Sequence, residues 1–174
     1  MEFLDLTRLP SFNLIGFKER TSNLNEMNAD TAKIKKTFIK FLQTLSFKRL
    51  FSVYTEYESD HNSNYTYFCG KEFLKNEIIE NGLETIKTEE QTYLIIKTDF
   101  GDFPNVILEA WQKIWEIPFN SLGLKRSYKT DFEIYENTTN DFSKGCASIY
   151  IGVEIINEQI AFRMQELRKI IKYL

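Results

Sequence analysis

Apolar and polar positions alternate along most of the chain in short runs, whereas two longer stretches show helical spacing. Residues 12–20 form an apolar-rich run between turn-forming residues, which is typical of a β-strand. From about residue 29 to 45 the apolar side chains share one face and the lysines lie mostly off it, which predicts an amphipathic helix. Residues 49–58 and 65–73 are rich in Tyr, Phe, Val and Thr and flank a polar stretch, so they predict a β-hairpin.

The same order of elements appears again in the second half of the chain. Residues 74–90 are polar and irregular, and we interpret them as a linking excursion. Residues 91–100 predict a strand, a helix follows, and residues 129–137 and 147–156 are two further strand candidates. The sequence therefore predicts a β-α-β-β unit that occurs twice.

The helix of the second unit has start and stop signals. The turn at residues 101–104 supplies Asp102 as the expected N-cap and an early proline, and Pro118 marks the end. Helical spacing predicts an inward stripe made of Ile107, Ala110, Trp111, Ile114 and Trp115.

These elements predict an α+β fold in a single domain over residues 1–174. Duplicated β-α-β-β units, at about 10–73 and 91–156, form an antiparallel sheet with two helices on one face. Residues 157–174 add a C-terminal amphipathic helix, whose apolar stripe is Ile160, Met164, Leu167, Ile171 and Leu174. This helix either docks on its own domain or forms a dimer seam, because its spacing also suits helix pairing.

Composition and charge narrow the functional class. Aromatic residues make up 15% of the chain, and large rings fill cores but also line ligand clefts. The net charge of -3 offers no basic surface, so we expect no direct nucleic-acid partner. Cys69 and Cys146 lie far apart without a CxxC spacing, which argues against zinc and a disulfide framework, and we expect no metal and no cofactor.

The N-terminus lacks the basic and apolar regions of a signal peptide, and nowhere do about 18 apolar residues run together. We therefore expect a cytoplasmic protein without a membrane partner.

Short motifs in the second half follow a recognisable order: Gln91-Thr92-Tyr93-Leu94, Gly101, Ala110-Trp111-Gln112-Lys113-Ile114-Trp115, Asp131-Phe132-Glu133-Ile134-Tyr135 and Ile149-Tyr150-Ile151. With their spacing, they resemble the gyrase-inhibitor-like effector-binding domain. That bacterial family also supplies the ligand-sensing half of several multidrug-responsive transcription regulators. It includes stand-alone proteins, some of them on integron cassettes.

The first half is similar to the family more loosely. Residues 12–21 look like the opening strand with its glycine, and Tyr67-Phe68-Cys69-Gly70 is similar to the turn that closes the first repeat. Two departures stand out, because Gly152 occupies a position where the family usually has proline and residues 157–174 are an addition. No helix-turn-helix accompanies the domain, so we do not expect a complete transcription factor of that type.

Glu133 is the foremost candidate for a functional residue. Strand alternation puts it on the same face as Tyr135 and opposite Phe132 and Ile134. A carboxylate among rings and sheet backbone is poorly solvated and gains from an incoming cation. Taken alone, a glutamate in a strand is more often a solvent-facing spacer, but the resemblance implies an acidic ligand-binding residue at this position.

Aromatic residues are expected to wall a groove between the two helices. Trp111 either reaches this groove or fills the core, Trp115 is expected in the core, and His61 is expected on the solvated surface. Tyr67 and Tyr150 come from the closing strands of the two repeats and are expected to be near symmetry mates. The candidate walls are Tyr54, Tyr67, Trp111, Tyr135 and Tyr150, together with Trp115, for which the core is the favoured interpretation.

These features favour a protein that captures a flat, hydrophobic, cationic aromatic molecule, with Glu133 as its charge partner, in transcription regulation or drug sensing. One alternative is a small-molecule hydrolase, as in some family members, with Glu133 as general base and Tyr150 or Tyr67 as donor. Another is an interaction module whose acidic face or terminal helix contacts gyrase, a partner regulator or a second copy of the chain.

Overall fold

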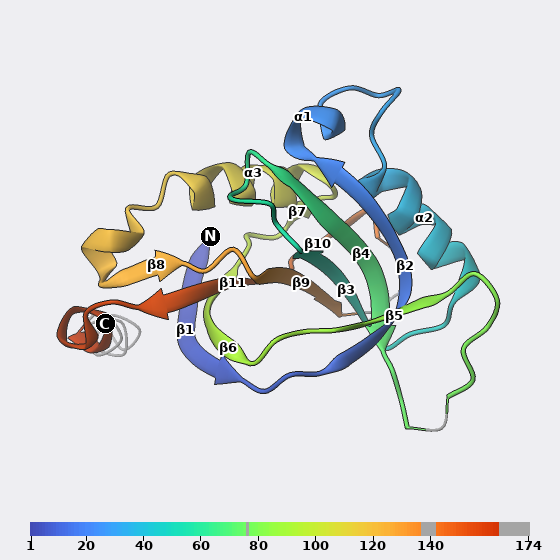
Figure 1. Cartoon of the computed structure of the whole chain (residues 1–174). Coiled ribbons are helices and arrows are strands. Elements are labelled where there is room, and N and C mark those ends of the chain that lie inside the picture. Colours follow the sequence, from blue (N-terminus) through green and yellow to red (C-terminus); the bar gives the residue numbers. More distant parts are fainter. Residues whose placement is uncertain (76, 137–141, 164–174) are drawn as a thin grey trace.

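Nine strands of the described chain form one large, curved antiparallel sheet (Figure 1). The computed structural model describes residues 1–75, 77–136 and 142–163. Along the sheet the order is β1 (Glu2–Leu9), β6 (Gln91–Lys97), β11 (Ser148–Ile155), β9 (Thr130–Glu136), β3 (Arg49–Thr55), β4 (Asn64–Glu72), β2 (Asn13–Ser22) and β5 (Glu84–Lys87). A short strand, β8 (Leu124–Arg126), pairs with β11 off this path.

The strand order confirms the predicted duplication. The first unit is β2, α2 (Ile34–Thr44), β3 and β4, and the second is β6, α3 (Asn105–Trp115), β9 and β11. The two units meet where β3 pairs with β9, with Ser52 opposite Glu133. Outward from this seam each unit continues in the same order, through β4 to β2 and through β11 to β6. The seam therefore lies at the centre of a pseudo-two-fold arrangement.

Both long helices cover the same face of the sheet, as predicted (Figure 1). The apolar cluster on this face contains Phe41 of α2 and Trp111 and Ile114 of α3. The opposite face carries a smaller cluster centred on Phe68, Tyr93 and Phe132, with Leu9 and Phe12 packed against it. Since each strand sends alternate side chains to the two faces, both clusters are built from the same central strands.

Two edge strands were not predicted from the sequence. β1 pairs with β6 and contains an irregularity between Phe3 and Asp5, and β5 pairs with β2 from within the stretch interpreted as a linking excursion. In β5 only Ile86 is partly buried, and its other three residues are exposed. Edge strands are held largely by backbone hydrogen bonds on one side, so their sequences need little apolar alternation.

The first helix is shorter than predicted, since it begins at Ile34 and not at about residue 29, and a separate turn of helix precedes it. α1 (Asn23–Glu26) ends in Glu26, whose carboxylate accepts hydrogen bonds from the backbone N–H groups of Lys33 and Ile34, each at 3.1 Å. These donors lie at the start of α2 and have no partner within that helix. The carboxylate of Glu26 therefore caps α2 from outside.

The predicted N-cap of the second helix is wrong. Asp102 lies in β7 (Gly101–Asp102), which pairs with β10 (Lys144–Gly145). The N-cap position of α3 is Pro104, which makes no side-chain capping bond. Asp102 therefore pairs with a strand distant in the sequence and does not occupy the N-cap position that the local sequence predicts.

The C-terminal segment begins as a helix, and its start docks on its own chain. Residues 158–163 are helical, and Ala161 is buried. Gly123, which follows the 3-10 helix η1 (Phe119–Leu122), adopts a φ of 70° and accepts backbone hydrogen bonds from Ile156 and Asn157. The stripe residues from Met164 onward lie outside the described residues. In the part that the structure covers, no helix is long and apolar enough to span a membrane.

Candidate functional site

Glu133 lies at the centre of the molecule, on the seam between the two repeats. It occupies the middle of β9 and is buried, with an exposed fraction of 1%. Its carboxylate bonds to Tyr135 and to Trp111 of α3, so it points to the helix-covered face, whereas Phe132 belongs to the cluster on the other face. The alternation expected from the sequence is therefore present in β9, and Glu133 is no solvent-facing spacer.

Three of the candidate aromatic residues converge on this carboxylate. The hydroxyl of Tyr54 and the indole N–H of Trp111 donate to Oε1 of Glu133 at 2.9 and 2.6 Å. The hydroxyl of Tyr135 donates to Oε2 at 2.6 Å. These donors come from β3, α3 and β9, so the site exists only when the central strands and the second helix are assembled.

The electrostatic setting of Glu133 is unusual because all its hydrogen-bond donors are neutral. Burial raises the pKa of the Glu133 carboxyl, and the hydrogen bonds from Tyr135, Trp111 and Tyr54 oppose this effect without cancelling it. Within residues 1–75, 77–136 and 142–163, no Lys, Arg or His forms an ion pair with Glu133. In the described part of the chain, this buried acidic group thus has no counter-charge.

Tyr67 lies close by but does not bond to the carboxylate. It is fully buried, and its hydroxyl shares a hydrogen bond of 3.1 Å with Oγ of Ser52. Its ring centroid lies 5.6 Å from that of Tyr54. Burial, the neighbouring Cys69 and the charge of Glu133 all raise the pKa of Tyr67, so it stays protonated beside the acidic group.

Tyr150 lies on the opposite face of the sheet. Its ring stacks on that of Phe132, with centroids 4.4 Å apart and an interplanar angle of 12°. In the sheet Tyr150 is paired with Phe132, and paired residues of neighbouring strands point to the same face. Tyr67 belongs to the helix-covered cluster, so the two tyrosines are not symmetry mates and the structure does not bring Tyr150 to Glu133.

A cavity of about 660 Å3 opens beside this site. Tyr135 lines it and also donates a hydrogen bond to Glu133, so this residue contacts both the cavity and the carboxylate. The ring centroid of Phe103 lies 5.4 Å from that of Tyr135. Other described residues around this cavity are Lys97, Phe100, Glu136, Phe142 and Lys144. Ligand-sized space with aromatic walls therefore lies one residue away from the buried acid.

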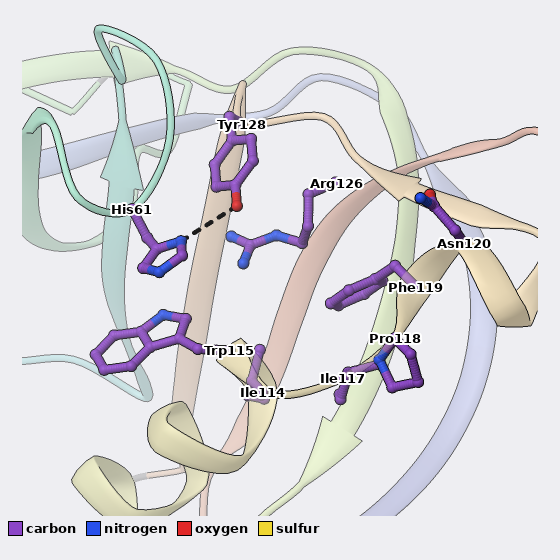
Figure 2. A pocket seen from close by; sticks show the side chains of 9 residues that line it. All are labelled: His61, Ile114, Trp115, Ile117, Pro118, Phe119, Asn120, Arg126 and Tyr128. Carbon is purple, nitrogen blue, oxygen red and sulfur yellow. Dashed lines mark hydrogen bonds between the residues drawn. The ribbon is translucent and has the colours of Figure 1, made fainter.

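A second pocket, of about 380 Å3, is lined by His61 and Trp115 among other residues (Figure 2). His61, expected on the solvated surface, instead stacks on Trp115 with centroids 5.4 Å apart, and its Nδ1 lies 3.2 Å from the hydroxyl of Tyr128. Partial burial lowers the pKa of His61. Trp115, expected in the core, is 37% exposed and lines this pocket. The sequence signal that could have indicated this exposure is the place of Trp115 at the end of α3, because helix ends often reach the surface.

Arg126 and Asp131 form a buried ion pair beside this pocket. Asp131 has no exposed surface and also accepts hydrogen bonds of 2.8 Å from the hydroxyl of Tyr57 and from the backbone N–H of Gly152. A proline at position 152 would lack that N–H. Gly152, at the position where the resemblance implies proline, is thus a hydrogen-bond partner of Asp131.

Known proteins share this architecture. The integron cassette protein VCH_CASS2 from the mobile metagenome of Vibrio cholerae is 28% identical, with a TM-score of 0.67 over 88% of this chain and 98% of that one. The structure of SAV2435 bound to tetraphenylphosphonium has the same fold at 16% identity, with a TM-score of 0.63 over 88% of this chain and 94% of that one. YobU of Bacillus subtilis (strain 168), named as a candidate transcriptional regulator, is 25% identical over 162 residues, which are 88% of this chain and 99% of YobU.

The similarity extends to a defined protein family. Residues 5–153 match the Cass2 family, and this range contains every strand from β2 to β9, both long helices and Glu133. The chain therefore belongs to the integron-associated effector binding proteins.

Proposed function

We propose that this protein reversibly binds a hydrophobic, aromatic organic cation, with Glu133 as the charge partner of the ligand. The observation that carries the proposal is the burial of Glu133 among three neutral donors, Tyr54, Trp111 and Tyr135. A buried carboxylate is costly unless it is neutralised or paired. A cationic ligand would supply the missing counter-charge, and an effector-binding family is the setting in which such a site is expected.

The aromatic neighbours of Glu133 support the same ligand class. The rings of Tyr54 and Trp111 lie 5.2 Å apart at 72°, and Phe38 and Phe103 both pack against the ring of Tyr135. A cation against such ring faces gains about 0.5 to 2 kcal/mol for each favourable contact, depending on how far it is desolvated. Neutral apolar molecules would gain the burial but not this electrostatic part.

The cavity beside Tyr135 supplies the route to the acid. Its volume of about 660 Å3 lies within the range of small-molecule sites. In the structure the hydroxyl of Tyr135 occupies one oxygen of the carboxylate, so a bound cation would displace this hydroxyl and take its place. The relative SAV2435, which shares the fold, binds tetraphenylphosphonium, a bulky aromatic cation of the proposed class.

The resemblance to a candidate transcriptional regulator favours drug sensing or transcription regulation as the biological use of this binding. The hydrolase alternative has less geometric support. Tyr150 lies on the far face of the sheet, and the hydroxyl of Tyr67 is engaged by Ser52.

Calorimetric titration with methyltriphenylphosphonium and its neutral relative triphenylphosphine oxide tests the proposal. Wild type should bind the cation saturably and the oxide more weakly by about tenfold or more, since a factor of ten corresponds to about 1.4 kcal/mol. Glu133→Gln should remove this preference. Glu109→Gln, an exposed change on α3, is the matched control and should keep it. Equal affinities for both probes in wild type would refute the charge-partner role.

A further inference from the structure

The pocket at the end of α3 has walls from three separate parts of the chain (Figure 2). His61 comes from the loop between β3 and β4, Trp115 from the last position of α3, and Arg126 and Tyr128 from β8 and the turn that follows it. Phe119 of η1 closes another side. Glu133 is not among its lining residues, so this space is distinct from the acidic site.

Four of the nine residues that line this pocket carry aromatic rings. The imidazole of His61 lies nearly parallel to the indole of Trp115, at 11°, and to the ring of Tyr128, at 22°. The guanidinium carbon of Arg126 lies 4.5 Å from the ring centroid of Tyr128 and 5.8 Å from that of Phe119. Planar walls of this kind select planar ligands by stacking.

Arg126 provides unused hydrogen-bond donors. Its side chain is 7% exposed, and Figure 2 shows its guanidinium reaching into the pocket toward His61. Among the described residues it makes one hydrogen bond, from Nη2 to Asp131, and its Nε has no partner. Buried donors are nearly always satisfied in native proteins, and an unsatisfied one costs about 1 to 3 kcal/mol. The spare donors therefore favour a ligand that brings an acceptor.

The charge balance of the pocket determines what kind of acceptor fits. Asp131 neutralises Arg126, so the pair offers N–H donors with little net charge. A cationic ligand would be repelled by the guanidinium, and an anionic one would approach Asp131 and Asp60, whose charges already act on His61. An uncharged carbonyl or amide oxygen meets the donors without either penalty.

The backbone around the pocket is held in an uncommon conformation. Glu56 and Tyr128 are the non-glycine residues with positive φ in the described part of the chain, at 52° and 51°. They lie in the two turns that present His61 and Tyr128. For a bulky residue such as Tyr128 this conformation costs about 1 kcal/mol or more, so it persists only where surrounding contacts impose it.

We propose that this pocket is a second ligand site, which binds an uncharged planar aromatic molecule that carries a carbonyl or amide oxygen. The ring stacks on Trp115 and its neighbours, and the oxygen accepts from the guanidinium of Arg126. This site differs in ligand class from the cation site at Glu133, and it does not depend on that proposal.

Two-dimensional 15N–1H NMR tests the second site, because the chain contains two tryptophans, one at each site. Trp111→Phe and Trp115→Phe assign the two indole signals. Four bicyclic probes are titrated: 2-quinolone (an uncharged acceptor), naphthalene (no acceptor), 1-naphthoate (an anion) and N-methylquinolinium (a cation). We expect 2-quinolone to shift the Trp115 and Arg126 Nε–H signals saturably, with an affinity about tenfold or more above that of naphthalene.

Variants identify the donor and separate the two sites. Arg126→Lys keeps a cation facing Asp131 but removes the guanidinium donors, so it should bring the affinity for 2-quinolone down to that for naphthalene. His61→Ala, a change in a loop, should weaken the binding of all four bicyclic probes at Trp115. This variant replaces Arg126→Lys in the test if Arg126→Lys does not fold. Glu133→Gln should leave 2-quinolone binding unchanged. No saturable shift at Trp115, equal affinities for 2-quinolone and naphthalene, or tightest binding at Trp115 by the anion or the cation would each overturn the inference.

Discussion

The indole N–H of Trp111 donates a hydrogen bond of 2.6 Å to Oε1 of Glu133, and this contact ties the second helix to the seam between the repeats. Both groups are buried, with exposed fractions of 7% and 1%. Trp111 is thus neither a plain core residue nor a free wall of an open groove. It is a donor that holds the carboxylate of Glu133 in place.

Replacing Trp111 with Phe keeps an aromatic ring but removes this donor. We expect Trp111→Phe to lower the free energy of unfolding by about 1 to 3 kcal/mol, because a buried carboxylate oxygen loses a hydrogen bond. The pKa of Glu133 should also rise further, since the indole bond favours the ionised form. Urea denaturation measures the first effect. Trp115→Phe, which removes no bond to Glu133, is the control, and equal losses from both changes would contradict the expectation.

The raised pKa of Glu133 predicts a particular dependence of stability on pH. Below its usual value of 4.5 the group is protonated in both the folded and the unfolded chain, and its contribution to stability is fully present. As pH rises, Glu133 ionises first in the unfolded chain, which stabilises the unfolded state. The contribution to stability therefore falls progressively, and the fall is complete once the pH exceeds the folded-state pKa. The difference in unfolding free energy between wild type and Glu133→Gln should therefore fall with pH. Urea denaturation at a series of pH values checks this, and a flat or rising difference would show that the pKa is not raised.

The affinity for a cation should change with pH in the opposite direction. Methyltriphenylphosphonium carries a permanent charge, so protonation of the ligand plays no part. Because the ionised form of Glu133 is the binding form, affinity should rise with pH through the raised pKa and then level off. Calorimetry with wild type and Glu133→Gln measures this. Two controls should give affinities that do not vary with pH: Glu133→Gln with the cation, and wild type with the neutral triphenylphosphine oxide. If the affinities of wild type for the cation and for the oxide changed with pH in parallel, linkage to Glu133 would be excluded.

The sequence was sufficient to predict the repeated unit and the side chains that share a face with Glu133 in β9, for a physical reason. In β9 the apolar and polar positions alternate, so the face of Glu133 relative to Phe132 follows from strand geometry alone. The two long helices were likewise predicted by the period of their apolar stripes. These features are local, and a single sequence contains them.

The position of Tyr150 depends on information that the sequence does not carry locally. Ile149 and Ile151 on one side of β11 and Tyr150 on the other are all suited to a core, so the pattern does not say which side meets the helices. Pairing with Phe132 of β9 determines it. His61 is a similar case, because the end of α3, distant in sequence, buries a loop residue that is flanked by polar neighbours.

Substitutions of Gly152 test whether its backbone N–H contributes to the stability of this chain. Its N–H donates to Asp131 at 2.8 Å, and a Cβ at this position would lie 2.6 Å from the carbonyl oxygen of Thr130. Gly152→Ala adds only the steric conflict, whereas Gly152→Pro adds a similar conflict and also removes the hydrogen bond to a buried carboxylate. Gly152→Pro should therefore be the less stable variant by about 1 to 3 kcal/mol in urea denaturation. Equal stabilities would mean that Arg126 and Tyr57 alone satisfy Asp131, and that the glycine is retained for space alone.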